Sequence, residues 1–182
     1  MIEPVHELFR STFGNEPTVI ARAPGRIEFV GNHTDYNGGD VLGVAVEQGI
    51  CVAARPRDDR MVRGVSQVGE TLFEHSLDHL DTSPESFNWS RYPLGVLWAI
   101  QEHGLSFAHG FDLAIVSNVP SGAGMSSSAA LELATAYATL DGTSHKFSRK
   151  DIVKICQYSE NHYVGVPCGI LDQGVSGFGK KV

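Results

Sequence analysis

The chain has 182 residues, of which 42% are hydrophobic and 19% are charged, and this composition is typical of one globular domain with a buried core. Its formal net charge of −7 argues against a general nucleic-acid-binding protein, because such proteins normally carry a basic face. No apolar run approaches the roughly 18 residues that a membrane span requires, and the acidic N-terminus lacks the features of a signal peptide. Three cysteines outside any CxxC pattern favour a reducing compartment, so we expect a cytoplasmic protein without nucleic-acid or membrane partners.

The first half of the chain predicts one helix followed by extended segments. Apolar Val5, Leu8 and Phe9 recur at helical spacing and predict a helix over residues 5–13 that ends near Gly14. β-Branched and alternating apolar residues then predict strands. These cover residues 18–22, a break at 23–25, a second extended piece at 26–30, one or two buried strands within 41–54, and a hairpin of 61–68 with 71–77 around Gly69.

The second half of the chain predicts three helices and one strand. The helices cover residues 89–103, 129–140 and 149 to about 162, and the strand covers residues 111–117. Ser148 and Asp151 have the capping-box form at the start of the last helix. Glu160 lies at the border of that helix's apolar stripe, where a carboxylate either reaches water or requires a partner. No element is predicted for the glycine-rich residues 165–179.

A loop of small residues lies between the predicted strand and the helix that follows it. Residues 120–130 read Pro-Ser-Gly-Ala-Gly-Met-Ser-Ser-Ser-Ala-Ala, in which Gly122 and Gly124 permit positive φ angles. The free N–H groups at the start of a helix bind anions, and serine hydroxyls can contact phosphate or a hard cation. It is not a Walker loop, because no lysine occurs between Arg91 and Lys146. The alternative is a small-residue turn that caps an ordinary helix.

Residues 31–39 form a second dense polar stretch. They read Gly-Asn-His-Thr-Asp-Tyr-Asn-Gly-Gly, with Asn32, His33 and Asp35 close together. A carboxylate, an amide and an imidazole in one turn can hold the vicinal hydroxyls of a sugar. The alternative is a surface turn with Asx-type hydrogen bonds.

Three segments together resemble the galactokinases, a branch of the GHMP small-molecule kinases. Residues 23–39 resemble the galactokinase signature, residues 120–130 the GHMP phosphate loop, and residues 168–173 (Cys-Gly-Ile-Leu-Asp-Gln) the stretch that holds the catalytic aspartate. The order and spacing of the three segments also fit. The resemblance covers essentially the whole chain.

This resemblance implies an α+β fold like the GHMP kinase N-terminal domain, similar to domain 2 of ribosomal protein S5, with a mixed sheet and packed helices. It implies that residues 1–182 form the N-terminal domain and that the chain stops before a second, C-terminal GHMP domain. It also implies phosphoryl transfer from ATP to the anomeric hydroxyl of a hexose, with galactose preferred. The expected partners are the sugar and ATP, and a monomer is expected for the full-length protein.

The same resemblance implies a role for each residue that matches a family motif. Asp172 and Arg26 are the expected catalytic residues, and Ser128 and Glu160 are the expected ligands of Mg²⁺. The sugar is expected to contact Asn32, His33, Thr34, Asp35 and Gly169. ATP is expected to contact Gly122, Ala123, Gly124, Met125, Ser126, Ser127 and Ser128, with a looser match for Ser66, Trp89 and Tyr92. For Trp89 and Tyr92, packing in the core or at a helix start is the alternative.

Two positions depart from the galactokinase pattern. Asn32 stands where the family usually has Glu, and Glu28 stands where it usually has Asn. An amide at position 32 can donate as well as accept a hydrogen bond, which opens N-acetylgalactosamine or galacturonate as alternative substrates. Glu28 lies two residues from Arg26, so strand alternation predicts that both side chains share one face and can pair.

Two further readings compete with a catalytic sugar kinase. One is a sugar and ATP sensor on the same fold, but the intact phosphate loop, Arg26 and Asp172 favour catalysis. The other is a mevalonate or homoserine kinase, and the turn His33-Thr34-Asp35-Tyr36 argues against it.

Overall fold

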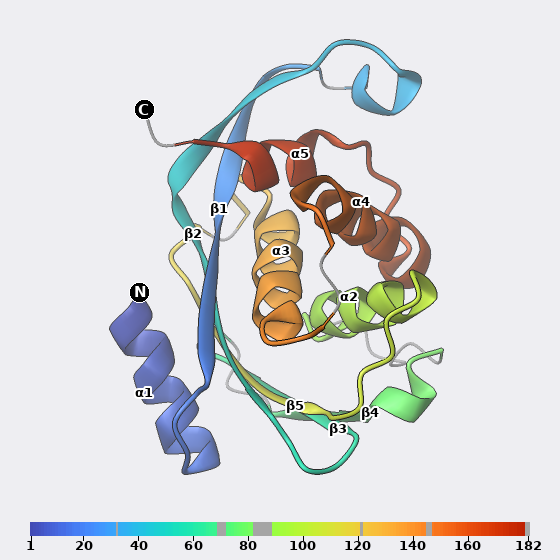
Figure 1. The fold of residues 1–182 in the computed structure, drawn as a ribbon. Helices are drawn as coiled ribbons and strands as arrows, with labels where there is room; N and C mark the ends of the chain where they lie inside the picture. Colours follow the sequence, from blue (N-terminus) through green and yellow to red (C-terminus); the bar gives the residue numbers. More distant parts are fainter. Residues whose placement is uncertain (32, 69–71, 82–88, 121, 145–146, 181–182) are drawn as a thin grey trace.

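The computed structural model describes residues 1–182 apart from 32, 69–71, 82–88, 121, 145–146 and 181–182. Five strands form one mixed sheet in the order β1-β2-β5-β3-β4 (Figure 1). They are β1 (Val19–Val30), β2 (Leu42–Pro56), β3 (Met61–Ser66), β4 (Phe73–Ser76) and β5 (Phe111–Ser117). Neighbouring strands are antiparallel except β3 and β5, which run parallel and are joined through a helix. The predicted α+β fold with a mixed sheet is confirmed.

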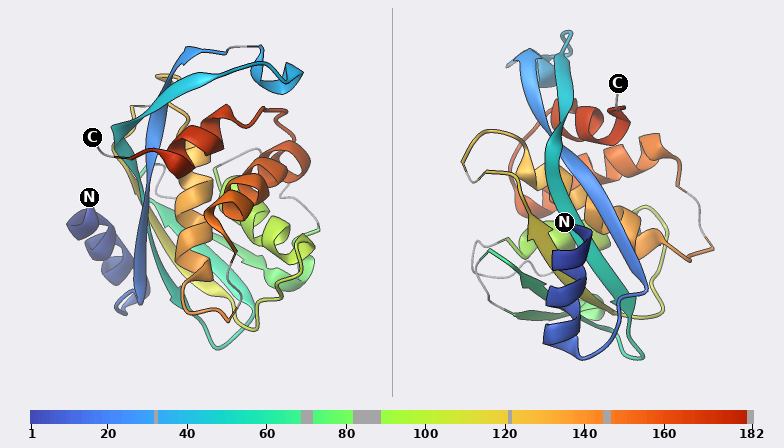
Figure 2. Two further views of the ribbon diagram at one scale, coloured as in Figure 1. Left: turned by 45° about the horizontal axis from the view of Figure 1, so that its top comes forward. Right: turned by 90° about the vertical axis from the view of Figure 1, so that its left-hand side faces the viewer.

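Helices cover both faces of this sheet. They are α1 (Ile2–Phe13), α2 (Arg91–Glu102), α3 (Ser127–Leu140), α4 (Arg149–Ser159) and α5 (Leu171–Phe178), and a π-helical turn, Glu160–Val164, extends α4. Four of them, α2 to α5, gather on one face, while α1 packs alone on the other (Figures 1 and 2). In the described part of the chain no helix is both long and apolar enough to cross a membrane.

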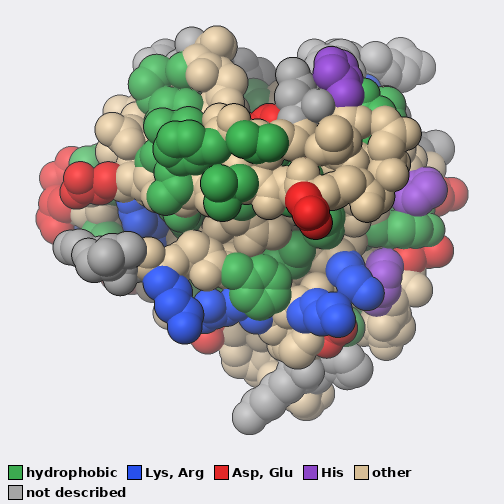
Figure 3. Space-filling view, turned by 90° about the horizontal axis from the view of Figure 1, so that it is seen from above, with side chains coloured by type: hydrophobic (Ala, Val, Ile, Leu, Met, Phe, Trp, Pro, Cys, Tyr) green, Lys and Arg blue, Asp and Glu red, His purple; other side chains and the backbone are tan. Residues whose placement is uncertain are grey.

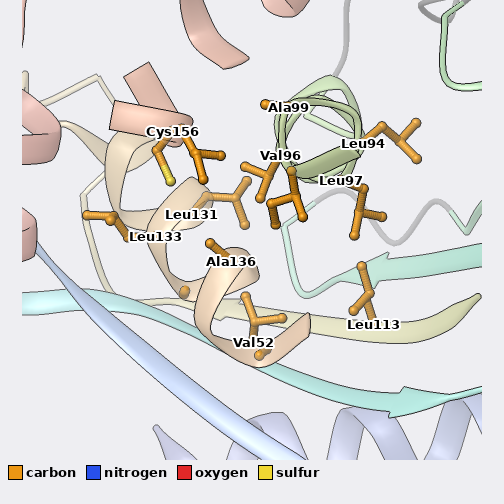
Figure 4. Packing of buried hydrophobic residues seen from close by; sticks show 14 of the residues in the cluster. Val52, Leu94, Val96, Leu97, Ala99, Leu113, Leu131, Leu133, Ala136 and Cys156 are labelled. Atoms are coloured by element: carbon orange, nitrogen blue, oxygen red, sulfur yellow. The ribbon is translucent and has the colours of Figure 1, made fainter. Parts of the chain in front are cut away.

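The central strands bury side chains on both faces. Val52 and Ala54 of β2 belong to the core beneath α2, α3 and α4, whereas Cys51 and Ala53 belong to the smaller core beneath α1. This two-sided burial follows from the near-continuous apolar run in β2, since alternate residues point to opposite faces. The larger core is packed around α3, whose Leu131, Leu133 and Ala136 are shown in Figure 4.

Three predictions of local structure need correction. β1 is one continuous strand across Pro24 and Gly25, not two pieces separated by a break. Proline is tolerated because β1 is an edge strand, and the register shift between Pro24 and Arg26 absorbs the irregularity. The region around Asp172 is helical, because α5 runs through it. The helix from Arg149 is a regular α-helix only to Ser159, after which the π turn begins.

Several other predictions are confirmed by the described residues. β5 has the expected bounds, β3 and β4 form the expected hairpin, and α1 ends at Gly14 in the left-handed conformation. Ser148 and Asp151 form the complete capping box of α4. Gly69, which was predicted as the hairpin turn, lies outside the described residues.

Candidate active site

The loop before α3 leaves the start of that helix open to an anion. Gly122 and Gly124 have φ angles of 70° and 64°, and Ser126 is held at 50° in the left-handed region. Ser126 is the N-cap residue of α3, but its side chain makes no capping hydrogen bond. The first N–H groups of the helix therefore lack the usual side-chain acceptor, which is the arrangement that binds phosphate.

This loop is fastened to β1 through its backbone. The N–H of Arg26 donates to the carbonyl of Met125 at 3.1 Å. A Cβ atom added to Gly25 would lie 2.6 Å from the same carbonyl oxygen, so glycine is required for this approach. The local sequence around Gly25 indicates only a break, because the close approach involves residues a hundred positions apart.

Arg26 and Asp172 form the central ion pair of the site. Nε and Nη2 of Arg26 donate to Oδ1 of Asp172 at 2.9 and 2.5 Å. Nη1 of Arg26 donates to the carbonyl of Gly124 at 2.6 Å, and the Oγ atom of Ser126 donates to Oδ2 of Asp172 at 2.5 Å. Among the described residues, Arg26 forms an ion pair with Asp172 and none with Glu28. The pairing of Arg26 with Glu28 that strand alternation predicted is therefore absent among them.

Glu160 is buried within a cluster of polar groups below the loop. Only 5% of the residue is exposed, and its Oε2 atom accepts from Nε2 of Gln173 at 2.6 Å. Burial raises the pKa of this carboxyl, while hydrogen bonds from Ser128, Cys168 and Gln173 act in the opposite direction. Glu160 thus has the buried partners that its position in the helix requires. It is also the first residue of the π turn, a distortion often found at functional sites.

Gln173 connects Glu160 to a second buried carboxyl that the sequence analysis missed. Its Nε2 atom also donates to Oε2 of Glu132 at 3.1 Å, and both Gln173 and Glu132 are fully buried. Burial and the nearby Glu160 raise the pKa of Glu132 well above its ordinary value. The signal available in the sequence was a carboxylate in the apolar run of α3, one residue after Leu131.

The pair of Ser128 and Glu160 suits a small, hard cation. Both side chains offer oxygen atoms, and the Ser128 hydroxyl acts to lower the pKa of Glu160, so the two groups lie near each other. In the described part of the chain no group of three or more His, Cys, Asp or Glu is arranged to hold a metal ion. Two oxygen ligands fit Mg²⁺, which usually keeps several waters and binds substrate phosphates in addition to one or two protein groups.

The polar stretch within residues 31–39, called the polar turn from here on, is attached to the start of α5. Oδ1 and Oδ2 of Asp35 accept from the N–H groups of Ile170 and Leu171 at 3.0 and 2.9 Å, so this carboxylate caps the helix that carries Asp172. A Cβ atom at Gly169 would lie 2.0 Å from the Asp35 carboxylate, so the contact requires glycine. Of the predicted sugar contacts, Asp35 and Gly169 are therefore brought together.

The polar turn and α5 enclose a small cavity. Its volume is about 160 Å³ and its wall contains Arg26, Glu28, His33, Asp35, Gly169 and Asp172. Nδ1 of His33 is hydrogen-bonded to the hydroxyl of Tyr36, and His33 has a positive φ of 67°. The hydroxyl of Thr34 donates to the carbonyl of Gly31 inside the turn, and Asn32 lies outside the described residues. Figure 3 shows the molecule from above, where several hydrophobic side chains gather on one part of the face and Lys and Arg side chains on another.

The three looser nucleotide contacts lie at the edge of the core. Trp89 packs edge-on against Phe73 with ring centroids 5.2 Å apart, and Tyr92 is partly buried against the same core. Ser66 is buried and its Oγ accepts from the N–H of Val68. The contacts of Trp89 and Tyr92 agree with the packing alternative. Burial, with smaller contributions from the charges of Glu160 and Glu132, raises the pKa of Tyr92.

Comparisons with known proteins show the family to which the chain belongs. The model described as "Galactokinase galactose-binding signature" matches residues 7–56, and the one described as "GHMP kinases N terminal domain" matches residues 91–180. The chain belongs to the GHMP kinase family. It is 43% identical over 178 residues to a galactokinase of Roseiflexus sp. and 39% identical over 184 residues to one of Bacillus subtilis.

The solved structures agree with this family. The galactokinase of Lactococcus lactis, solved in complex with galactose, matches 98% of the chain at 34% identity with a TM-score of 0.90. The mevalonate kinase of Methanococcus jannaschii shares the fold, with a TM-score of 0.77 at 16% identity. The chain spans about half the length of the relatives that it matches, namely 44% of the Roseiflexus protein, 47% of the Bacillus protein and 47% of the Lactococcus protein.

Proposed function

We propose that this chain is the N-terminal domain of a galactokinase, which transfers the terminal phosphoryl group of ATP to the anomeric hydroxyl of galactose. The observation that carries the proposal is the position of the Arg26–Asp172 ion pair. Both residues line the cavity beside the polar turn, and both are hydrogen-bonded to the loop before α3 through Gly124 and Ser126. A sugar hydroxyl in the cavity and a phosphate at the start of α3 would meet at this pair.

Phosphoryl transfer requires positioning and charge neutralisation more than covalent catalysis. The N–H groups of the loop before α3 and the hydroxyls of Ser126, Ser127 and Ser128 hold the triphosphate. Arg26 neutralises charge on the phosphoryl group in transfer. Asp172 binds the reacting hydroxyl and accepts or orients its proton.

The sugar contacts come from the polar turn and from the segment before α5. His33, Asp35 and Gly169 line the cavity, and Thr34 lies between His33 and Asp35, with its hydroxyl donating to the carbonyl of Gly31. Asn32, which lies outside the described residues, is a further proposed sugar contact. Asp35 also fixes the first turn of α5, so the sugar-binding turn and the helix that bears Asp172 are held in one geometry.

Ser128 and Glu160 are the proposed ligands of Mg²⁺. When bound, this ion neutralises charge on the phosphate oxygens. A second domain of similar size is proposed to complete the cleft, because the relatives are about twice as long as this chain. The isolated 182 residues are accordingly expected to have little or no activity.

A coupled assay of ADP formation by the full-length protein that contains this chain tests the proposal. The panel contains galactose, N-acetylgalactosamine, galacturonate, glucose and arabinose, each with ATP and Mg²⁺. We expect ADP to form only when a hexose is present and fastest with galactose. Sugar binding without any ADP formation would favour the sensor, and robust turnover by residues 1–182 alone would contradict the need for a second domain.

A further inference from the structure

The cavity beside the polar turn contains three carboxylates. They are Glu28 of β1, Asp35 of the turn and Asp172 of α5. Sugar hydroxyls bind to carboxylates that have oxygen atoms available to accept hydrogen bonds. The three side chains differ in how far their oxygens are already engaged.

Two of the three carboxylates hold protein donors on both oxygens. Asp35 accepts from two backbone N–H groups, one on each oxygen. Asp172 accepts from Arg26 on Oδ1 and from Ser126 on Oδ2. These hydrogen bonds fix the orientation of both side chains. Each oxygen then has fewer lone pairs left to accept a hydrogen bond from a sugar.

Glu28 is the carboxylate with both oxygens available. Among the described residues it makes no hydrogen bond and no ion pair, although it is half-buried and lines the cavity. Its position follows from strand alternation, because Ile27 and Phe29 are 43% and 66% exposed while Arg26 and Glu28 turn inward. Its backbone is held opposite Gly43 of β2, so the side chain projects from a fixed point of the sheet.

We infer that Glu28 is a specificity-determining residue of the sugar site, where its carboxylate accepts hydrogen bonds from two hydroxyls of the sugar. This inference rests on the proposed function. His33 lines the same cavity and supplies a further ring nitrogen, because its hydrogen bond to another described side chain, that of Tyr36, uses Nδ1. The site is therefore built for a neutral polyol or for a sugar that carries an ammonium group.

Because Glu28 carries a negative charge, we expect an order of preference among charged sugars. A substrate carboxylate in the same small cavity meets a like charge close by, whereas a substrate ammonium group meets an opposite one. The chain is thus expected to discriminate against galacturonate and to accept galactosamine. This ordering differs from the one expected from Asn32 alone, which would admit an acidic sugar.

The test compares wild type, Glu28→Gln and Glu28→Asp in the full-length protein with galactose, galactosamine and galacturonate. For Glu28→Gln we expect the KM for galactose to rise about tenfold or more, because each charge-assisted hydrogen bond contributes on the order of 1.5–3 kcal/mol. The KM for ATP should stay within about twofold, since Glu28 lies on the sugar side of the ion pair. The ratio of kcat/KM for galacturonate to that for galactose should rise in Glu28→Gln and stay low in Glu28→Asp, which keeps the charge.

Glu74→Gln, at an exposed position of β4, is the matched control and should change none of these values. An unchanged KM for galactose and an unchanged galacturonate ratio in Glu28→Gln would overturn the inference while leaving the proposed kinase in place. If wild type phosphorylates no hexose, the proposed function fails. The affinities of wild type and Glu28→Gln for the three sugars, measured by calorimetry, then test whether Glu28 binds the sugar. Equal affinities in the two proteins would overturn the inference.

Discussion

The Oγ atom of Ser126 donates a hydrogen bond of 2.5 Å to Oδ2 of Asp172, which lies 46 residues further along the chain. Ser126 ends the loop that leaves the start of α3 open, and it adopts a left-handed backbone that few residues other than glycine favour. Asp172 lies on α5, at the edge of the cavity. One hydroxyl thus connects the proposed phosphate site to the proposed catalytic carboxylate.

Replacement of Ser126 by Gly and by Ala distinguishes the effect of its hydroxyl from the effect of its backbone conformation. Both variants lose the hydrogen bond to Asp172, whereas only glycine relaxes the left-handed strain. We expect kcat of the full-length protein to fall by about tenfold or more in both, because a hydrogen bond to a charged group contributes on the order of 1.5–3 kcal/mol. A steady-state assay that finds normal kcat in one variant and a large loss in the other would assign the effect to the backbone instead.

Asp172→Asn tests the proposed catalytic carboxylate itself. The amide retains the size of the side chain but removes the charge opposite Arg26, so kcat should fall by about 10²-fold or more while ATP binding remains measurable. Asp141→Asn, at an exposed position after α3, is the control. Near-normal turnover in Asp172→Asn would remove the role that is proposed for this residue.

The proposed metal ligands can be tested without turnover. Binding of Mn²⁺, as a paramagnetic substitute for Mg²⁺, is measured by electron paramagnetic resonance in the presence of a non-hydrolysable ATP analogue. Ser128→Ala and Glu160→Gln should each weaken this binding by about tenfold or more, in the range seen when groups around a metal are removed. The exposed Glu102→Gln should leave it unchanged. Equal affinity in all four proteins would exclude Ser128 and Glu160 as ligands.

Glu132→Gln should stabilise the isolated chain in a pH-dependent way. Burial, with Glu160 adding to it, raises the folded-state pKa of Glu132 well above its ordinary value of 4.5. Stability from the neutral acid is therefore complete below pH 4.5 and is lost as pH rises towards the folded-state value. Glutamine removes this loss, so the gain in Tm should be small near pH 4.5 and reach about 3 °C or more at pH 8.

Thermal unfolding of both proteins by circular dichroism across that pH range measures the effect. The exposed Glu102→Gln again serves as the control. A gain in Tm that is the same at every pH would show that packing, and not the charge of Glu132, limits stability.

The sequence predicted the elements whose signals are local. β2 and β5 are apolar on both faces, and α4 begins with a complete capping box. These apolar runs and the helix-start signal were enough to predict the elements. The three motifs also led to the proposal that Arg26 and Asp172 are catalytic. The structure pairs these residues with each other and with the loop before α3, and their catalytic roles stay a prediction.

What the sequence could not predict depends on contacts between distant residues. The glycine-rich residues 165–179 gave no helical pattern, yet α5 forms there because Asp35 caps its first turn and Gly177 packs against Val153. Similarly, β1 continues through Pro24 only because it lies at the sheet edge. The Glu132–Gln173–Glu160 cluster depends on three segments meeting, which no local pattern specifies.

The most direct test of the central claim is the chemical identity of the product. The full-length protein that contains this chain is incubated with ATP, Mg²⁺ and galactose, and the product is examined by ³¹P nuclear magnetic resonance with coupling to the sugar protons. We expect a phosphate coupled to the anomeric proton, which identifies a sugar 1-phosphate. A phosphate on any other sugar carbon, or ADP and free inorganic phosphate without a phosphorylated sugar, would contradict it.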